Sequence, residues 1–293
     1  MQDTYMVPDM PASEYHSRPE DSSGFLKTML QHSPFHARYK RENPTQQTPA
    51  MKFGTAWHSA FFEPDCFTVE YVTLPEGLDR RTKEGKALWA EVEASGRIVL
   101  TPDERQRIEA MTQAASEHPL TRDIINHGSP LAEPSVFSVD PSTGRGVRIR
   151  PDWLIAPCDQ FPLGLIVDGK TTTDAGPDGF GKAVWNLAYH LQAALYSDVA
   201  QRLFGTNEPP PFLWLAIEKD APYGLAYYQA GADVIERGRS DYTDMLLLAD
   251  ECDRNGFWPG YSTEVTPLSL PGWVKKADND DDVAAIGYVG DAA

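Results

Sequence analysis

The chain has 293 residues, 41% of them hydrophobic and 24% charged, and its formal net charge is −17 at pH 7. This length and composition predict one large globular domain, and no apolar run is long enough for a membrane-spanning helix. The three scattered cysteines argue against a disulfide framework or a CxxC-type zinc site, and the N-terminus lacks the pattern of a secretory signal, so we expect a cytoplasmic protein with no membrane partner.

The N-terminal part of the chain begins with a Pro-containing lead-in over residues 1–20. Short helices are predicted over 24–31 and 35–41, on either side of a Ser-Pro break. The next helix is predicted over 51–64, where large apolar residues recur at helical spacing and Pro64 ends the pattern.

One residue in this third helix can carry chemistry. His58 lies about 100° round the helix from Trp57, so it can face a cleft while its neighbours pack. The alternative is a hydrogen-bonded histidine on a packed helix, and the helix alone does not decide between them.

Basic residues are clustered although the chain as a whole is acidic. Residues 27–52 carry Lys27, Arg38, Lys40, Arg41 and Lys52 against Glu42 alone, and Arg145, Arg148 and Arg150 form a second group. A nucleic-acid-binding protein is usually basic. In this acidic chain DNA affinity would therefore depend on a local track, for which we name Lys40, Arg41, Arg148 and Arg150.

The middle of the chain predicts a strand over 67–74, amphipathic helices over 83–95 and 102–116, and a strand over 131–140 that contains Glu133.

Residues 145–170 then read as two short strands joined by a turn. Asp152 lies in the first strand, and Asp168 and Lys170 end the second. Residues two apart on a strand point to the same face, so Asp168 and Lys170 share a side, and Asp152 can come close if the strands pair.

The remaining elements follow from periodicity. The longest helix is predicted over 180–203 and places Tyr189, Gln192 and Tyr196 on one face. Strands are predicted over 212–218 and 224–229, and a closing helix over 232–255. We expect a single domain over 21–275, followed by an acidic, disordered tail over 276–293.

Two carboxylates as close as Asp152 and Asp168 repel each other unless a proton or a cation compensates. A hard divalent ion with oxygen ligands is the natural cation, and a lysine beside it can orient a water or neutralise a phosphate. The alternative is a pair of solvated aspartates at strand ends with a surface lysine, because charged residues are usually exposed.

Four separated motifs occur in order along the chain. They are GTAWH at 54–58 followed by Glu63-Pro64, then Arg150-Pro-Asp152-Trp, then Asp168-Gly-Lys170, then Tyr189-x-x-Gln192-x-x-x-Tyr196. The ordered set resembles the RecB-type branch of the PD-(D/E)XK nuclease superfamily, and most closely the RecE (exodeoxyribonuclease VIII) nuclease domain. The iron–sulfur cluster of some relatives needs four cysteines and cannot form here.

The resemblance implies an α/β fold with a restriction-endonuclease-like core, in which helices flank a mixed central sheet. It also implies roles for individual residues. Lys170 is then the catalytic lysine, Gln192 and Tyr196 support the site, and the metal ligands are Asp152, Asp168, the Gly169 carbonyl, His58 and, more weakly, Glu133.

By the same resemblance, the expected activity is that of an exonuclease that uses Mg²⁺, or Mn²⁺ in its place, to degrade double-stranded DNA from its ends. A 5′ to 3′ polarity, a homo-oligomeric ring, a single-strand annealing partner and a role in phage-type homologous recombination are implied with it. The alternative is a nuclease-fold DNA-binding module that acts as a recombination scaffold without catalysis.

Overall fold

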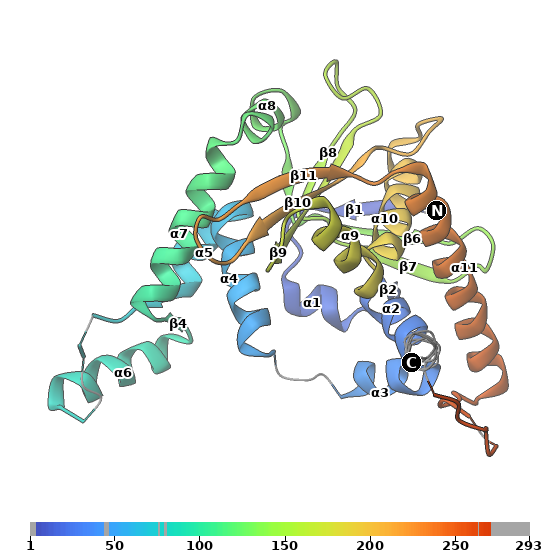
Figure 1. The fold of residues 1–293 in the computed structure, drawn as a ribbon, viewed down its shortest axis with the longest axis horizontal. Coiled ribbons are helices and arrows are strands. Elements are labelled where there is room, and N and C mark those ends of the chain that lie inside the picture. Colours follow the sequence, from blue (N-terminus) through green and yellow to red (C-terminus); the bar gives the residue numbers. More distant parts are fainter. Residues whose placement is uncertain (1–3, 44–46, 76, 79–80, 263, 271–293) are drawn as a thin grey trace, which may run out of the picture.

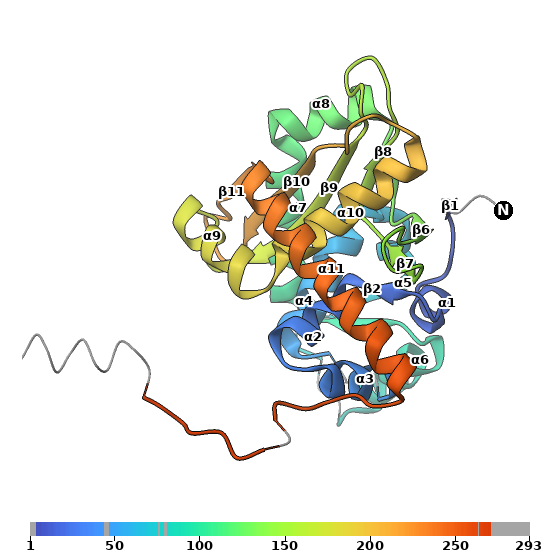
Figure 2. The same ribbon diagram turned by 90° about the vertical axis from the view of Figure 1, so that its right-hand side faces the viewer.

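Two β-sheets occupy the centre of the molecule, with helices on both sides (Figures 1 and 2). The computed structural model describes residues 4–43, 47–75, 77–78, 81–262 and 264–270. The predicted acidic tail lies outside these residues. None of the described helices is long and apolar enough to cross a membrane.

The larger sheet has five strands in the order β11–β10–β9–β8–β5. β9 and β10 are parallel, whereas the other neighbours are antiparallel, so the sheet is mixed. Its strands are β5 (Leu131–Ala132), β8 (Trp153–Ile155), β9 (Leu165–Thr172), β10 (Phe212–Glu218) and β11 (Leu225–Gln229).

The second sheet has four strands in the order β1–β6–β7–β2, and a separate two-stranded sheet pairs β3 with β4. These strands are β1 (Thr4–Val7), β2 (Asp21–Ser22), β3 (Tyr71–Thr73), β4 (Ile98–Leu100), β6 (Ser135–Val139) and β7 (Gly146–Ile149).

The described helices are α1 (Ala12–Ser17), α2 (Ser23–Gln31), α3 (Pro34–Glu42), α4 (Pro49–Phe62), α5 (Pro64–Glu70), α6 (Lys83–Ser95), α7 (Pro102–Glu117), α8 (Pro119–Gly128), α9 (Pro177–Asn186), α10 (Tyr189–Phe204) and α11 (Ala232–Asn255). Several begin at the caps that their sequences suggest. Ser22 caps α2, Ser33 caps α3 and Thr48 caps α4, each by accepting a backbone N–H in the first turn.

The five-stranded sheet separates two hydrophobic cores because successive side chains point to opposite faces. Ile166 of β9 packs with α2, α10 and α11, whereas Leu165 and Val167 pack with α4, α7 and α8. Figure 1 shows these two groups of helices on opposite sides of the sheet. Both faces of the sheet are thus buried. Polar side chains on its strands can therefore reach solvent only where a cleft is open.

The structure confirms the predicted fold class and corrects several local predictions. Residues 4–20, expected to be a loose lead-in, form β1, which pairs with β6, and α1. The first half of the predicted strand over 67–74 is helix, because α5 runs to Glu70, and the strand β3 covers only Tyr71–Thr73. Helix α8 was not predicted.

The predicted helix over 180–203 is two helices. They are separated at Ala188, which adopts a left-handed backbone conformation with φ of 50°. The break reorients the chain, so that α10 starts afresh at Tyr189.

The strand predicted over 131–140 and the first of the two strands predicted within 145–170 are also broken. Residues 131–140 divide into β5 and β6, and residues 145–156 divide into β7 and β8, so that each segment passes from one sheet to the other. The two crossing points carry Glu133 and Asp152, and the backbone N–H of Glu133 donates to the carbonyl of Asp152 at 3.1 Å. The candidate site is built at this junction.

Candidate active site

The junction between the two sheets holds two carboxylates in place. Asp152 is 7% exposed and lies between β7 and β8, immediately after Pro151. Glu133 has a φ of 48°, an uncommon conformation for a residue with a side chain, and such strained positions cluster at functional sites.

Strand β9 supplies the second aspartate and the lysine. Asp168 is 2% exposed, and its Oδ1 accepts a hydrogen bond from Nε2 of Gln192 at 2.7 Å. Its Oδ2 forms an ion pair with Nζ of Lys170, as expected for residues two apart on a strand. Between them, the backbone N–H of Gly169 donates to Oδ2 of Asp152 at 2.6 Å. Strand β9 therefore positions both aspartates.

Helix α4 packs directly on β9 at Gly169. A Cβ atom on Gly169 would lie 2.7 Å from Phe62 and 2.9 Å from Trp57, so only glycine leaves room for the aromatic face of α4. Trp57 is fully buried, whereas the neighbouring His58 turns into the cleft and brings its Nδ1 to 3.2 Å from Oδ2 of Asp152. The structure therefore places His58 beside a carboxylate, and Trp57 and Phe62 pack α4 against β9.

Polar side chains of α10 contact a lysine on α2 that the sequence did not indicate as part of the site. Nζ of Lys27, on α2, donates to Oε1 of Gln192 at 2.7 Å. The ammonium groups of Lys27 and Lys170 lie 5.0 and 4.9 Å from the ring centroid of Tyr189, within cation–π range. Lys27 was visible only as a member of the basic cluster, because nothing in its local sequence indicates a partner 165 residues away.

Tyr196 is the one predicted supporting residue that is not part of these contacts. It is buried, and its hydroxyl donates to the backbone carbonyl of Arg150 at 3.4 Å. Its contact is therefore to the chain just before Asp152 and not to a carboxylate.

The neighbours of each ionisable group decide its charge. Burial raises the pKa of Asp152, but His58 and Lys170 more than offset it, so the pKa is lowered. For His58, burial lowers the pKa, and the Asp152 carboxylate raises it by more. Burial raises the pKa of Glu133 to about 7, and the Asp152 carboxylate adds to this. The charge on Asp152 is thus compensated by neighbouring cations, whereas that on Glu133 is disfavoured by its surroundings.

The pKa values of the two lysines are shifted in opposite directions although both side chains are buried. Burial lowers the pKa of Lys170, but Asp168 and Asp152 outweigh this, so the pKa is raised and the side chain is an ammonium ion. Burial and the charge of Lys170 lower the pKa of Lys27 to about 7.

Of the four basic residues named for DNA binding, Arg150 contacts a candidate metal ligand, and the other three are exposed or bound elsewhere. Lys40 is exposed on α3. Arg41 pairs with Asp21, and Arg150 pairs with Glu133 at 2.7 Å. Arg148 is 8% exposed and donates to the backbone carbonyls of two residues near the N-terminus. Three of the four are therefore bound to other parts of the chain.

A divalent cation fits one group of side chains in the described part of the chain. His58, Glu133 and Asp152 each offer one ligand atom, and these atoms lie within 4.8 Å of one another. Ligands on one ion at 2.0–2.6 Å can be about that far apart, and the two carboxylates suit Mg²⁺ or Mn²⁺. Asp168, also predicted as a ligand, is not in this group and is held by Gln192 and Lys170.

His58, Glu133 and Lys170 line an open cleft of about 560 Å³, whereas Asp152 and Asp168 are buried and do not line it. Residues from α2, α4, β9 and α10 reach it, among them Lys27, His58, Gly169, Lys170 and Gln192. Three of the four predicted motifs therefore contribute residues to the lining of the cleft, and Arg150-Pro-Asp152-Trp does not.

The mixed sheet, its flanking helices, the aspartate and lysine within β9 and the aspartate just before β8 define a nuclease fold of the PD-(D/E)XK type. Within that class, the chain belongs to the family described as "PDDEXK-like domain of unknown function (DUF3799)", whose model matches residues 22–269. The match begins at the cap of α2 and runs past α11.

Comparison with solved structures agrees on the fold. A crystal structure described as a "Putative exonuclease" from Eubacterium rectale superposes with a TM-score of 0.59 at 13% identity, covering 92% of this chain and 98% of that one. The structure of SSO0001 is less similar, with a TM-score of 0.34 at 12% identity over 80% of this chain and 81% of that one. No curated protein sequence matches the chain.

Proposed function

We propose that the protein is a divalent-metal-dependent nuclease that degrades linear double-stranded DNA from its ends. The observation that carries this proposal is that ligand atoms of His58, Glu133 and Asp152 lie within 4.8 Å of one another, and that His58, Glu133 and Lys170 line one open cleft. The description of the Eubacterium rectale neighbour as a putative exonuclease supports the choice of DNA ends.

Different residues of the site have different roles in the proposed phosphodiester hydrolysis. His58, Glu133 and Asp152 would hold Mg²⁺ or Mn²⁺, and Asp168 would join them if Lys170 released its oxygen. When bound, the cation would lower the pKa of a water ligand and offset the charge that develops on the phosphate. The Gly169 N–H fixes the rotation of the Asp152 carboxylate, because it holds one of its oxygens.

Lys170 has a separate task. As a buried ammonium ion on the cleft wall, it can donate to a phosphate oxygen and stabilise negative charge in the transition state. Gln192 keeps Asp168 in the rotamer that faces Lys170, and Lys27 in turn keeps Gln192 in place. These contacts set the geometry in advance of substrate binding.

The finer parts of the proposal come from the resemblance to RecE. They are 5′ to 3′ polarity, a homo-oligomer, a single-strand annealing partner, a role in phage-type recombination and a cytoplasmic location. No iron–sulfur cluster is part of the proposal, since the chain has only three cysteines.

The test is digestion of end-labelled linear duplexes and covalently closed circles with Mg²⁺, with Mn²⁺ and with EDTA. We expect loss of the linear DNA only when a metal is present, with closed circles spared. Efficient nicking of circles would point to an endonuclease. Tight binding of DNA and of Mn²⁺ without any hydrolysis would favour the non-catalytic scaffold.

A further inference from the structure

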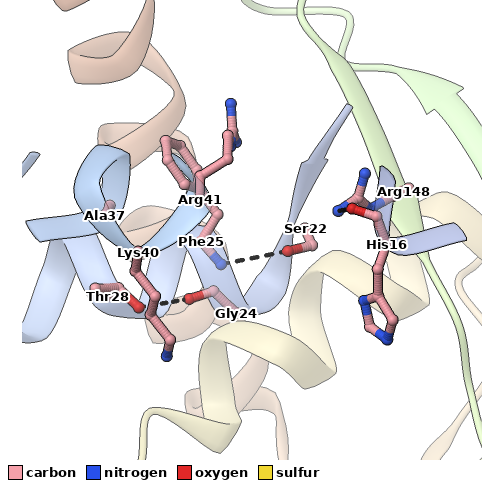
Figure 3. Close-up of a pocket in the computed structure, with 9 residues that line it drawn as sticks. All are labelled: His16, Ser22, Gly24, Phe25, Thr28, Ala37, Lys40, Arg41 and Arg148. Atoms are coloured by element: carbon pink, nitrogen blue, oxygen red, sulfur yellow. Dashed lines mark hydrogen bonds between the residues drawn. The ribbon is translucent and has the colours of Figure 1, made fainter. Parts of the chain in front are cut away.

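A second cavity, of about 360 Å³, lies between the N-terminal end of α2 and helix α3 (Figure 3). Its lining includes His16, Lys40, Arg41 and Arg148, and none of the nine described residues that line it is acidic. In a chain with a net charge of −17, this is a local concentration of positive charge.

One of these cations is buried and incompletely paired. Arg148 is 8% exposed, and its two terminal nitrogens donate to the carbonyls of Arg18 and His16. Its Nε is buried and has no hydrogen-bond partner. A buried donor without a partner is uncommon, and it is explained when the group belongs to a binding site for a ligand.

The neighbouring charges leave an excess of cations at the cavity. Arg41 pairs with Asp21 at 2.5 Å, but the same carboxylate also pairs with Arg145. Asp253 also pairs with Arg145, so two carboxylates serve Arg41 and Arg145. Lys40 and Arg148 have no ion pair among the residues that the structure describes, and they are the excess cations.

Helix α2 adds backbone donors to the same space. Ser22 caps the helix by accepting the N–H of Phe25 at 3.3 Å, and Ser22, Gly24 and Phe25 all line the cavity. The first N–H groups of a helix lack intrahelical partners and favour an anion through the helix dipole. This nine-residue helix therefore directs its positive end to the same place as the buried arginine.

The cavity is connected with the candidate active site. A third cavity shares His16, Ser22 and Gly24 with it, and shares Glu133 with the cleft that holds the metal ligands. Arg150 lines this intermediate cavity. A row of cavities thus leads from the metal ligands past Arg150 to Lys40 and Arg148, along the N-terminal end of α2.

We propose that this cavity is a phosphate-binding site, distinct from the scissile position, that takes a backbone or terminal phosphate of the DNA strand held in the cleft. The proposal rests on the proposed nuclease function for its choice of DNA. A phosphate offers several acceptor oxygens, and the guanidinium, ammonium and helix N–H groups here supply matching donors. It would hold the substrate strand in register while the cleft acts on a neighbouring linkage.

The test measures DNA binding by the full chain in EDTA, where a metal-dependent enzyme cannot cut. Duplexes carrying a 5′-phosphate or a 5′-hydroxyl are titrated by fluorescence anisotropy at several salt concentrations. The variant is Lys40→Ala, and the matched control is Lys86→Ala, an exposed lysine on α6 away from the cavity. Inorganic phosphate is then added as a competitor against chloride at equal ionic strength.

We expect Lys40→Ala to raise the Kd about tenfold, because a hydrogen bond to a charged group is lost. The slope of log K against log salt should fall by about 0.9, as for one phosphate contact. Inorganic phosphate should compete less well with the variant than with the unchanged protein. An effect confined to the 5′-phosphorylated duplex identifies a strand-end phosphate, and an equal effect on both duplexes identifies a phosphodiester.

The proposal is overturned if Lys40→Ala and Lys86→Ala have the same Kd and the same salt slope. Arg148→Lys, which keeps the positive charge but lacks Nε, gives a second measurement once thermal melts show that it folds. Digestion with Mg²⁺ separates the two proposals. If the protein cuts DNA and its Kd is unchanged by Lys40→Ala, only the phosphate site is refuted. If Lys40→Ala raises the Kd but the protein never cuts DNA, only the nuclease function is refuted.

Discussion

Replacing Gly169 by alanine tests whether the packing of α4 on β9 sets the geometry of the site. The added Cβ would lie 2.7 Å from one ring carbon of Phe62, 3.0 Å from another and 2.9 Å from Trp57. Real Cβ atoms do not approach so closely, so either the two rings or the strand must move. Both rings are part of the buried core, which has little room to yield.

The size of the effect follows from the overpacking. Adding a methyl group to a filled core costs about 1–3 kcal/mol. For a chain of this length, the loss lowers the Tm by a few degrees to about 10 °C. His58 follows Trp57 on the same helix, so a shift of α4 also lengthens the 3.2 Å contact between His58 and Asp152. We expect the metal-dependent rate per folded molecule to fall about tenfold or more, since small misplacements of catalytic groups are costly.

The assay combines thermal melts with initial rates on linear duplex at several Mg²⁺ concentrations. Gly181→Ala is the matched control, because a Cβ at this helical position on α9 meets nothing within 4 Å and alanine favours the helix. Gly169→Ala combined with Phe62→Leu removes one of the two clashing rings and should recover part of the lost stability. The reasoning is refuted if Gly169→Ala alone melts and cuts like the unchanged protein.

Other predictions concern the polar groups of the site. Asp168→Ala should abolish Mg²⁺-dependent hydrolysis and leave the fold intact, and unchanged cleavage by the folded variant would remove Asp168 from the mechanism. His58→Ala should fold and lose most of its activity. A variant that is less stable but has full turnover per folded molecule would show that His58 serves only in packing. Lys27→Met should lower kcat more than KM, because it frees Gln192, and equal rates would show that this support is dispensable. Mn²⁺ at 100 times its Kd should stabilise the unchanged protein by about 2.7 kcal/mol but not Asp152→Ala, and equal stabilisation of both would place the ion elsewhere.

The sequence predicted the fold class and many elements because local patterns dominate there. β10 and α11 have the predicted bounds, since their periodicity is clear and turn residues flank them. The helix break at Ala188 was missed, because a left-handed alanine has no local signal and is imposed by the packing around it. The strand breaks beside Glu133 and Asp152 were missed for a similar reason, since both flanking segments have strand composition and only the assembled sheets decide which sheet each half joins.

The candidate site was predictable as far as its motifs were local. The contact between Asp168 and Lys170 follows from strand alternation alone. The contact between His58 and Asp152 depends on how α4 packs across the sheet, so the helix sequence left two interpretations open. Lys27 could not be assigned, because its partner Gln192 is distant along the chain and a lysine in a basic cluster is usually a surface residue.

The separation along the chain between the residues of the site also bears on when the protein becomes competent during synthesis. The amide of Gln192 holds Asp168 and accepts from Lys27, which was made 165 residues earlier. A nascent chain that ends before α10 therefore has both aspartates and Lys170, but lacks the group that positions Asp168. Domains fold as units while they are being made. A ribosome-bound or truncated fragment that ends before α10 should accordingly show no metal-dependent hydrolysis of DNA.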